Sequence, residues 1–231
     1  MEFLLTSGFW LGLIKIVWID ITLSGDNAVV IALAARSLPP SQQTKAVVLG
    51  SGAAVALRVS LIVVATWLLQ LPWLEIAGGL LLLWIGIKLL NQDEGDAAGD
   101  SPKPGGLLAA VRTILVADLI MSLDNIIAVA AAAQGNMVLL ILGLAISIPL
   151  VVFGSTLIIK LMDRFPIIIQ AGAALIGWVA GETMIRDTAL KGLVGGRDWL
   201  HYVAAAMGAV LVLGIGRVCV ARAQTARRAA D

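Results

Sequence analysis

The sequence of 231 residues is poor in cysteine and histidine, with only Cys219 and His201. A single cysteine excludes an internal disulfide and a thiolate metal cluster. The lack of imidazole and thiolate groups disfavours Zn²⁺ and Cu⁺ sites, which usually need them. Charged residues make up 13% of the chain, whereas a soluble domain carries about 25%. The sequence also has no basic run long enough to follow a nucleic-acid backbone, so we expect no nucleic-acid partner.

What the chain has in abundance is apolar sequence: 60% of its residues are hydrophobic and its mean hydropathy is +0.99. A bilayer crossing needs about 20 mostly apolar residues. Seven segments reach this length, at roughly 9–35, 46–69, 73–90, 108–133, 137–159, 167–185 and 202–220. The sequence therefore predicts an all-α membrane protein with seven transmembrane helices in the lipid bilayer.

The basic residues at the ends of these segments predict the orientation. Eleven lie in alternate connections or in the tail, and three lie on the other side, before the last segment. The eleven are Arg36, Lys45, Lys88, Lys103, Arg112, Lys160, Arg164, Arg217, Arg222, Arg227 and Arg228. Because Lys and Arg collect on the cytoplasmic side, we expect the N-terminus outside and the C-terminus in the cytoplasm.

Two polar stretches interrupt the apolar sequence in the same way. "DITLSGDNAVVIALA" begins at Asp20 and "DLIMSLDNIIAVAAA" begins at Asp118, with Asp, Ser, Asp and Asn at the same relative places. A second match joins "AGGLLLLWIG" from Ala77 to "AGAALIGWVA" from Ala171. A repeat of three spans is odd, so its second copy must be inserted upside down, as in many secondary transporters.

The repeat divides the chain into four parts. We expect a first three-helix repeat at 1–90, a cytoplasmic linker at 91–107 and a second, inverted repeat at 108–185. An outer loop, an unpaired seventh helix and a basic cytoplasmic tail follow at 186–231.

Helix geometry places the polar residues of each motif on a face. Positions 4 and 7 apart share a face, so Asp20, Ser24 and Asn27 form one stripe, and Asp118, Ser122 and Asn125 form its copy. Asp26 and Asp124 lie about 120° away, and join the same cavity only where the helix loosens or meets another span. Gly25 makes loosening easy in the first copy. Leu123 takes its place in the second copy, where we expect less distortion.

Depth counting along straight helices places the four carboxylates in two tiers. Asp20 then lies level with Asp124, and Asp118 with Asp26, with about 9 Å between the tiers. A buried carboxylate costs about 2.5–3.5 kcal/mol on insertion scales, so four of them need protons, cations or water. Ser and Asn alone could serve to join helices, but the repeated carboxylates indicate a cation pathway.

The oxygen ligands favour hard cations such as Mn²⁺, Mg²⁺ or Ca²⁺. The predicted metal ligands are Asp20, Asp26, Asn27, Asp118, Asp124 and Asn125, supported by Ser24, Ser122, Arg58 and Glu182. Arg58 falls within the second span, where we expect it to balance the charge of the Asp cluster. Glu182 lies toward the outer end of the sixth span, as either a vestibule ligand or an interfacial residue.

The two motifs resemble the paired Asp-Asn signatures of the TerC family of integral membrane proteins, most closely its YjbE-type branch of candidate metal transporters. The resemblance covers essentially all seven spans. It implies seven helices, an inner-membrane location and export of Mn²⁺. By motif match it carries a metal role onto Asp20, Asp26, Asn27, Asp118, Asp124 and Asn125.

Functions other than metal transport can also place carboxylates inside a membrane protein. An intramembrane aspartyl protease needs Tyr-Asp and Gly-x-Gly-Asp contexts, which these motifs lack, so we expect neither an enzyme nor a resident cofactor. An exporter of amino acids or other small solutes stays open as the alternative, and an accessory subunit is a third class.

Four carboxylates in one dry region cannot all stay ionised without compensation, which predicts exchange of the metal against H⁺ or Na⁺. The sequence leaves the oligomeric state open.

Overall fold

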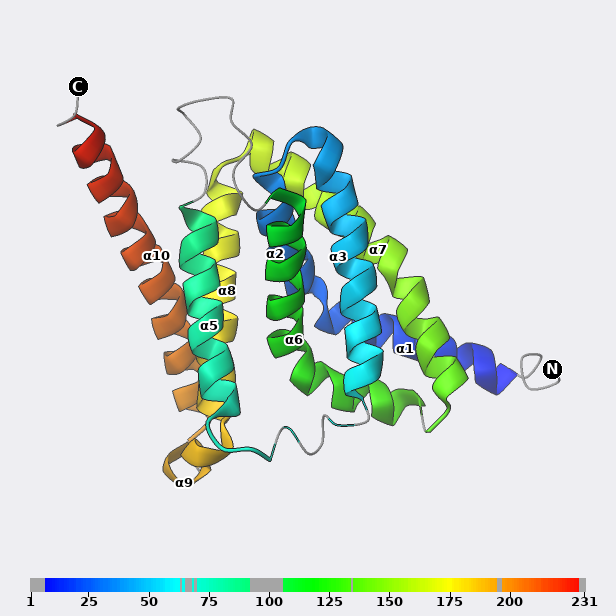
Figure 1. The fold of residues 1–231 in the computed structure, drawn as a ribbon. Helices are drawn as coiled ribbons and strands as arrows, with labels where there is room; N and C mark the ends of the chain where they lie inside the picture. The colour runs from blue at the N-terminus through cyan, green and yellow to red at the C-terminus, as the bar shows by residue number, and fades with distance from the viewer. Residues whose placement is uncertain are drawn as a thin grey trace.

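The computed structural model describes residues 7–62, 64, 68, 70–91, 106–133, 135–194 and 197–228. Every regular element within these ranges is helical, which confirms the all-α class. The elements are α1 (Ser7–Leu23), α2 (Gly25–Arg36), α3 (Pro40–Leu61), α5 (Leu74–Leu90), α6 (Gly106–Ala133), α7 (Met137–Arg164), α8 (Ile167–Arg186), η3 (Thr188–Leu190), α9 (Lys191–Val194) and α10 (Trp199–Arg228) (Figure 1).

Five of the described helices are each long and apolar enough to cross a membrane: α3, α6, α7, α8 and α10. Helices α1 and α2 meet the same test as a pair that is bent by 54°, which gives six spans if the pair is one. The remaining predicted span corresponds to α5, whose 17 residues extend about 25 Å. The described structure therefore contains five to six candidate spans, and they match predicted segments.

The predicted second span, 46–69, overlaps its helix but is shifted toward the C-terminus. Its helix, α3, begins at Pro40 and ends at Leu61, and residues 63, 65–67 and 69 lie outside the described part. Pro40 starts the helix early because proline fits the first helical position. The Gln43 side chain reinforces this start by donating to the carbonyl groups of Arg36 and Leu38 at 3.1 and 3.0 Å.

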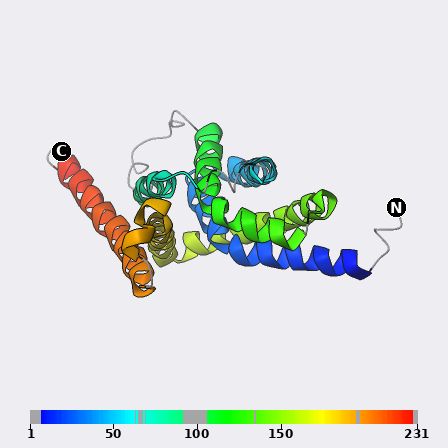
Figure 2. The ribbon, with the colours of Figure 1, turned by 90° about the horizontal axis from the view of Figure 1, so that it is seen from below.

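The helices of the two predicted repeats pack in a reciprocal way. Helix α3 packs against α6, and α7 packs against α1 and α2; α5 touches α6, and α8 touches α2. Helices α5 and α8 pack against each other, and α10 covers them both at the flank opposite α1 (Figure 2). The connection between the two sets, residues 92–105, lies outside the described part, as does the end of the predicted tail at 229–231.

Two apolar clusters form the core of the described part of the chain. The larger joins α2, α3, α5, α6, α7 and α8 through fully buried side chains such as Leu33, Leu82 and Ile176. The smaller joins α1 to α6 and α7, with Ile16 and Leu144 at its centre. Because α1 belongs to one cluster and α2 to the other, the junction between these two helices lies at the boundary of the two packed regions.

Candidate functional site

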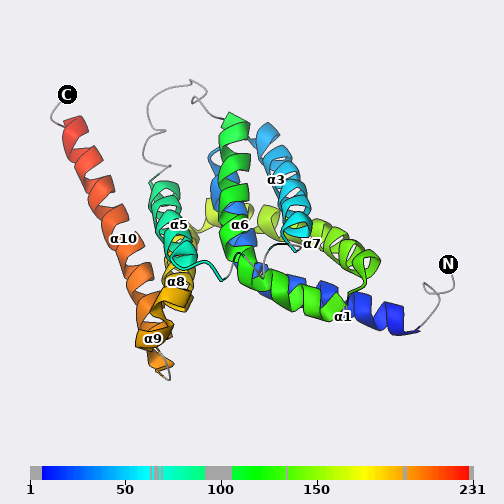
Figure 3. The ribbon, with the colours of Figure 1, turned by 60° about the horizontal axis from the view of Figure 1, so that its bottom comes forward.

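The first polar motif lies at the junction of α1 and α2. Ser24 has left the helical conformation, with φ −106° and ψ 8°, and Gly25 begins α2. The break falls at the Gly25 side of the motif, where the sequence predicts loosening. The second motif lies within the continuous helix α6, although Figure 3 shows that α6 changes direction along its length before it runs beside α1. The equivalent glycine is absent there, and no helix end interrupts the motif.

The break frees polar groups that the two motifs then satisfy. The carbonyl oxygen of Leu23 accepts a hydrogen bond from Asn125 Nδ2 at 2.9 Å, across from α6. The backbone N–H of Asn27 donates to Asp26 Oδ1 at 2.9 Å. The Asn27 side chain donates from Nδ2 to Asp118 Oδ1 on α6 at 3.1 Å. Both asparagines hold the broken helix against α6, so part of their role is to join helices.

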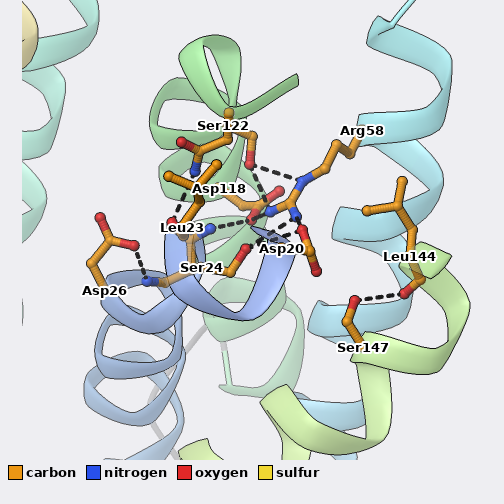
Figure 4. A network of polar contacts seen from close by, with 11 residues as sticks. Asp20, Leu23, Ser24, Asp26, Arg58, Asp118, Ser122, Leu144 and Ser147 are labelled. Atoms are coloured by element: carbon orange, nitrogen blue, oxygen red, sulfur yellow. Dashed lines mark hydrogen bonds and ion pairs between the residues drawn. The ribbon is translucent and has the colours of Figure 1, made fainter. Parts of the chain in front are cut away.

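The centre of the site is a buried network that we call the ionic cluster: Asp20, Ser24, Asn27, Arg58, Asp118 and Ser122. Arg58 reaches from α3 between the two motifs (Figure 4). Its Nη1 makes an ion pair with Asp20 and donates to Ser24 Oγ at 3.2 Å. Its Nη2 makes an ion pair with Asp118 at 2.8 Å and donates to Ser122 Oγ at 2.8 Å. One guanidinium thus binds an Asp-Ser pair from each copy of the motif.

The ionic cluster is withdrawn from solvent. The exposed fractions of Asp20, Arg58 and Asp118 are 1, 4 and 5%. Ion pairs at this depth offset the large desolvation cost of their charges only when their geometry and hydrogen bonding are good. With both carboxylates ionised, two negative charges face one positive charge, so the cluster retains one uncompensated negative charge.

A small cavity of about 20 Å³ adjoins the cluster and is lined by residues of both motifs and by Ser51 and Ser147. Asn27 Oδ1, Asp118 Oδ2 and Ser51 Oγ, which belong to residues that line it, are buried and have no hydrogen-bond partner within the described structure. Such groups normally find a partner, because a buried unsatisfied polar atom is costly. The cavity has room for about one water-sized particle.

A second cavity of about 360 Å³ opens on the other side of the break. Its polar lining residues include Asp26, Asn125, Glu182 and Arg186, and the last two form an ion pair. Figure 4 shows Asp26 on the side of α2 away from Arg58. Neighbouring motif residues therefore serve different cavities: Asn27 lines the small cavity, and Asp26 lines the second one.

The predicted tiers were wrong for Asp20 and Asp118, because both bind the same guanidinium. Depth counting assumed straight helices along one axis, whereas α1 and α2 meet at a bend of 54°. Asp124 lies on α6, but its side chain is outside the described part. Within the described residues, no three acidic, histidine or cysteine side chains lie close enough together to hold a metal ion. Two of the predicted ligands, Asp20 and Asp118, are instead bound by Arg58.

Sequence reasoning missed Asp187, which lies just after α8 and is fully buried. Its carboxylate accepts hydrogen bonds from the backbone N–H groups of Trp73, Glu75 and Ile76 at the start of α5, at 2.9 to 3.2 Å, and from Ala189 at 2.8 Å. Burial alone would raise the pKa of Asp187, but these four N–H groups outweigh it and lower the pKa. An acidic residue directly after a helix end was the available signal.

We expect Asp187→Ala to lower the free energy of unfolding by about 1–3 kcal/mol, because buried backbone N–H groups lose their acceptor. Asp163→Ala, which removes an exposed carboxylate near the end of α7, is the matched control and should change little. Because folding lowers the pKa, the stabilisation is fully present above about pH 4 and is lost as the pH falls through the folded-state pKa. Thermal unfolding in detergent across pH measures both effects, and equal midpoints for the two variants would refute this role.

The apolar helices, the bent helix pair α1–α2 and the buried ionic cluster define a multi-pass α-helical membrane protein with a polar centre. The chain belongs to the integral membrane protein TerC family, whose model matches residues 5–228.

Three relatives illustrate this membership. The chain is 43% identical over 183 residues to the uncharacterized membrane protein YjbE of Bacillus subtilis (strain 168), covering 79% of this chain and 83% of YjbE. It is 30% identical to the uncharacterized membrane protein YceF of the same organism, covering 68% of this chain and 64% of YceF. The UPF0053 inner membrane protein YoaE of Escherichia coli (strain K12) is 26% identical over 73% of this chain, which spans 36% of YoaE. No solved structure matches.

Proposed function

We propose that this protein is a transporter that exports divalent metal ions, foremost Mn²⁺, from the cytoplasm across the inner membrane. The observation that most supports this is the convergence of the two motif copies on one buried charged cluster at a broken helix. Ionisable residues inside a membrane protein are expensive and are concentrated on ion and substrate pathways. Broken spans that meet near the middle of the membrane are a common way of building such a site.

The proposed architecture has seven spans, with α5 included, arranged as two inverted three-helix repeats at 1–90 and 108–185. The reciprocal packing of α3 with α6 and of α7 with α1 and α2 supports this arrangement. The seventh helix, α10, is an addition to the second repeat, and the linker at 91–107 and the basic tail are cytoplasmic.

The proposed cargo ligands are Asp20, Asp26, Asn27, Asp118, Asp124 and Asn125, with Ser24 and Ser122 as supporting oxygens. They serve two stations, the ionic cluster and the second cavity, which lie on opposite sides of the broken helix. Glu182 belongs to the second station. The excess negative charge of the ionic cluster supports exchange of the cargo against H⁺ or Na⁺ as the counter-ion. The proposed transport cycle involves no enzymatic step and no resident cofactor.

An exporter of amino acids or other small solutes is the alternative, and the size of the second cavity favours it. A cavity of about 360 Å³ is much larger than a single ion, and it carries both acidic groups and Arg186. A zwitterion would match such a lining. Competition between Mn²⁺ and a panel of amino acids for the purified protein distinguishes the two functions.

The proposed orientation can be tested with single cysteines at positions 99 and 229, in the linker and the tail. Both positions should resist a membrane-impermeant thiol reagent that is added from the periplasmic side, because positive-inside counting places them in the cytoplasm. A single cysteine in the outer loop, at position 192, should react and serves as the control, with the native Cys219 replaced by Ser. Ready labelling at 99 or 229 would overturn the topology.

The proposed selectivity follows from ligand chemistry. Cells that express the protein should tolerate added Mn²⁺ and gain little against Zn²⁺ or Cu²⁺, because carboxylate and amide oxygens without imidazole or thiolate favour harder ions. Growth across a series of each metal, with metal content measured in the same cells, tests this. Equal protection against all three metals would contradict the assignment of Mn²⁺.

A further inference from the structure

Arg58 binds the two motif copies in a matched way. Nη1 takes the Asp20–Ser24 pair, Nη2 takes the Asp118–Ser122 pair, and Nε adds a second bond to Ser122 Oγ at 3.1 Å. In each pair the serine lies one helical turn after the aspartate. A planar guanidinium can grip two such groups at once, whereas an ammonium group acts as a point charge. The residue is therefore suited to hold the two copies together.

We propose that the Arg58 guanidinium is a tethered substitute for the cargo ion: it occupies Asp20 and Asp118 in the empty transporter and must leave them when the ion binds. This inference rests on the proposed function, since it names how the same site is regulated. It assigns Arg58 a role beyond charge balance, as a competitor for the cargo's own ligands.

Competition follows from the contacts of the cluster. Asp20 Oδ1 and Asp118 Oδ1 both accept from Arg58, and an ion that used these oxygens would lie against the guanidinium. Like charges repel strongly where little solvent screens them. Within the described residues no third acidic side chain joins the pair as a metal ligand, so an ion that is bound by both carboxylates has to take the place of the guanidinium.

The cluster also offers a first contact for an incoming ion. Asp118 Oδ2, Asn27 Oδ1 and Ser51 Oγ have no partner within the described structure, and their residues line the small cavity beside Arg58. A partly dehydrated ion can bind these oxygens before the guanidinium moves. Arg58 can then give way stepwise, and neither carboxylate is left buried without a positive partner.

The replacement of the cargo ion by Arg58 in the empty site affects the rate of the return step. An exporter that has released its divalent ion must return without it, and a single H⁺ or Na⁺ neutralises only one of the two carboxylates, so the other would be buried without a positive partner. Arg58 supplies a positive charge for the return. Exchange of cargo for cargo, in which the site is refilled before it returns, does not need this help.

Equilibrium binding of Mn²⁺ to purified protein tests the competition. If Arg58 occupies the site in about 90% of empty molecules, its removal strengthens apparent binding about tenfold. We therefore expect Arg58→Gln to bind Mn²⁺ about tenfold more tightly than wild type. Arg58→Lys keeps the charge but loses the planar guanidinium that contacts both Asp-Ser pairs, and should also bind Mn²⁺ more tightly than wild type. Arg112→Gln, at an exposed position on α6, is the matched control and should bind as wild type does.

Fluxes in proteoliposomes give a second measurement on the same variants. Arg58→Gln should lose net Mn²⁺ efflux and retain Mn²⁺-for-Mn²⁺ exchange, a split that a merely misfolded protein cannot produce. Loss of both fluxes together would overturn the proposal that Arg58 stands in for the ion, while leaving the proposed metal transport intact. Binding of Mn²⁺ by the two Arg58 variants that is no tighter than in the wild type would do the same. Tighter binding by Arg58→Gln with unchanged binding by Arg58→Lys would mean that Arg58 only repels the ion through its positive charge. This result would also overturn the proposal. If the wild type neither binds nor moves Mn²⁺, the proposed function fails and this inference fails with it.

Discussion

Asp20→Asn and Asp118→Asn are each expected to lower Mn²⁺ efflux about 10- to 100-fold, because each removes one of the proposed charged oxygen ligands from the buried centre. The change keeps the shape of the side chain. It also removes only one negative charge, so the other carboxylate still balances Arg58. We therefore expect both variants to reach the membrane folded. Efflux from inside-out vesicles, normalised to the amount of inserted protein, measures the effect.

Asp→Asn changes at other positions test whether the loss of efflux is specific to the ionic cluster. Asp163→Asn changes an exposed carboxylate on α7 and should leave transport unaltered. Asp26→Asn and Asp124→Asn should also impair efflux severely if the second station belongs to the pathway. Near-normal efflux by these two variants would show that they face away from it, and near-normal efflux by Asp20→Asn and Asp118→Asn would contradict the site itself.

Gly208→Leu is expected to have the largest effect on stability. At this position on α10 a Cβ atom would collide with the backbone of α8: with the carbonyl oxygen of Gly177, with its carbon at 3.0 Å and with Gly181 N at 3.1 Å. Neither backbone can yield, so the helices must separate. Close approach through glycine is a main source of helix association in membranes. Overpacking of this kind costs about 1–3 kcal/mol and occasionally more.

Gly214→Leu is the matched control, since Gly214 lies on the same helix with nothing within 4 Å of its Cβ position. Thermal unfolding in detergent should show a clear loss of stability for Gly208→Leu and a midpoint close to that of the wild type for Gly214→Leu. Equal midpoints would mean that α10 is held by contacts other than this glycine interface.

Much of the helical organisation could be predicted from apolar runs alone. The runs at 73–90, 108–133 and 137–159 correspond closely to α5, α6 and α7, because length and hydropathy decide a span with little help from tertiary contacts. The junction at Ser24 could also be predicted, from a glycine inside a polar motif. The position of α3 could not, since Pro40 and Gln43 extend the helix into sequence that is too polar to read as a span.

The geometry of the ionic cluster could not be predicted from the sequence. The spacing of Asp20 and Ser24 predicts a shared face, but the meeting of Asp20 with Asp118 depends on the bend between α1 and α2 and on the reach of Arg58. The role of Asp187 depends on the approach of α5, which is 112 residues away in sequence at Glu75. Gly177 and Gly208 likewise acquire their importance only from the packing of α8 against α10. Long-range contacts of this kind leave no local pattern.

The proposed function requires that the chain itself moves a divalent cation through the site formed by its two motifs. The most direct measurement uses purified protein in proteoliposomes, with Mn²⁺ added to the cytoplasmic face and with Mn²⁺-sensitive and pH-sensitive dyes inside. We expect saturable entry of Mn²⁺ that falls about 10- to 100-fold in Asp118→Asn and is accompanied by counterflow of protons, or depends on sodium on the opposite side. Entry no faster than in protein-free liposomes, at every imposed pH and sodium gradient, would contradict it.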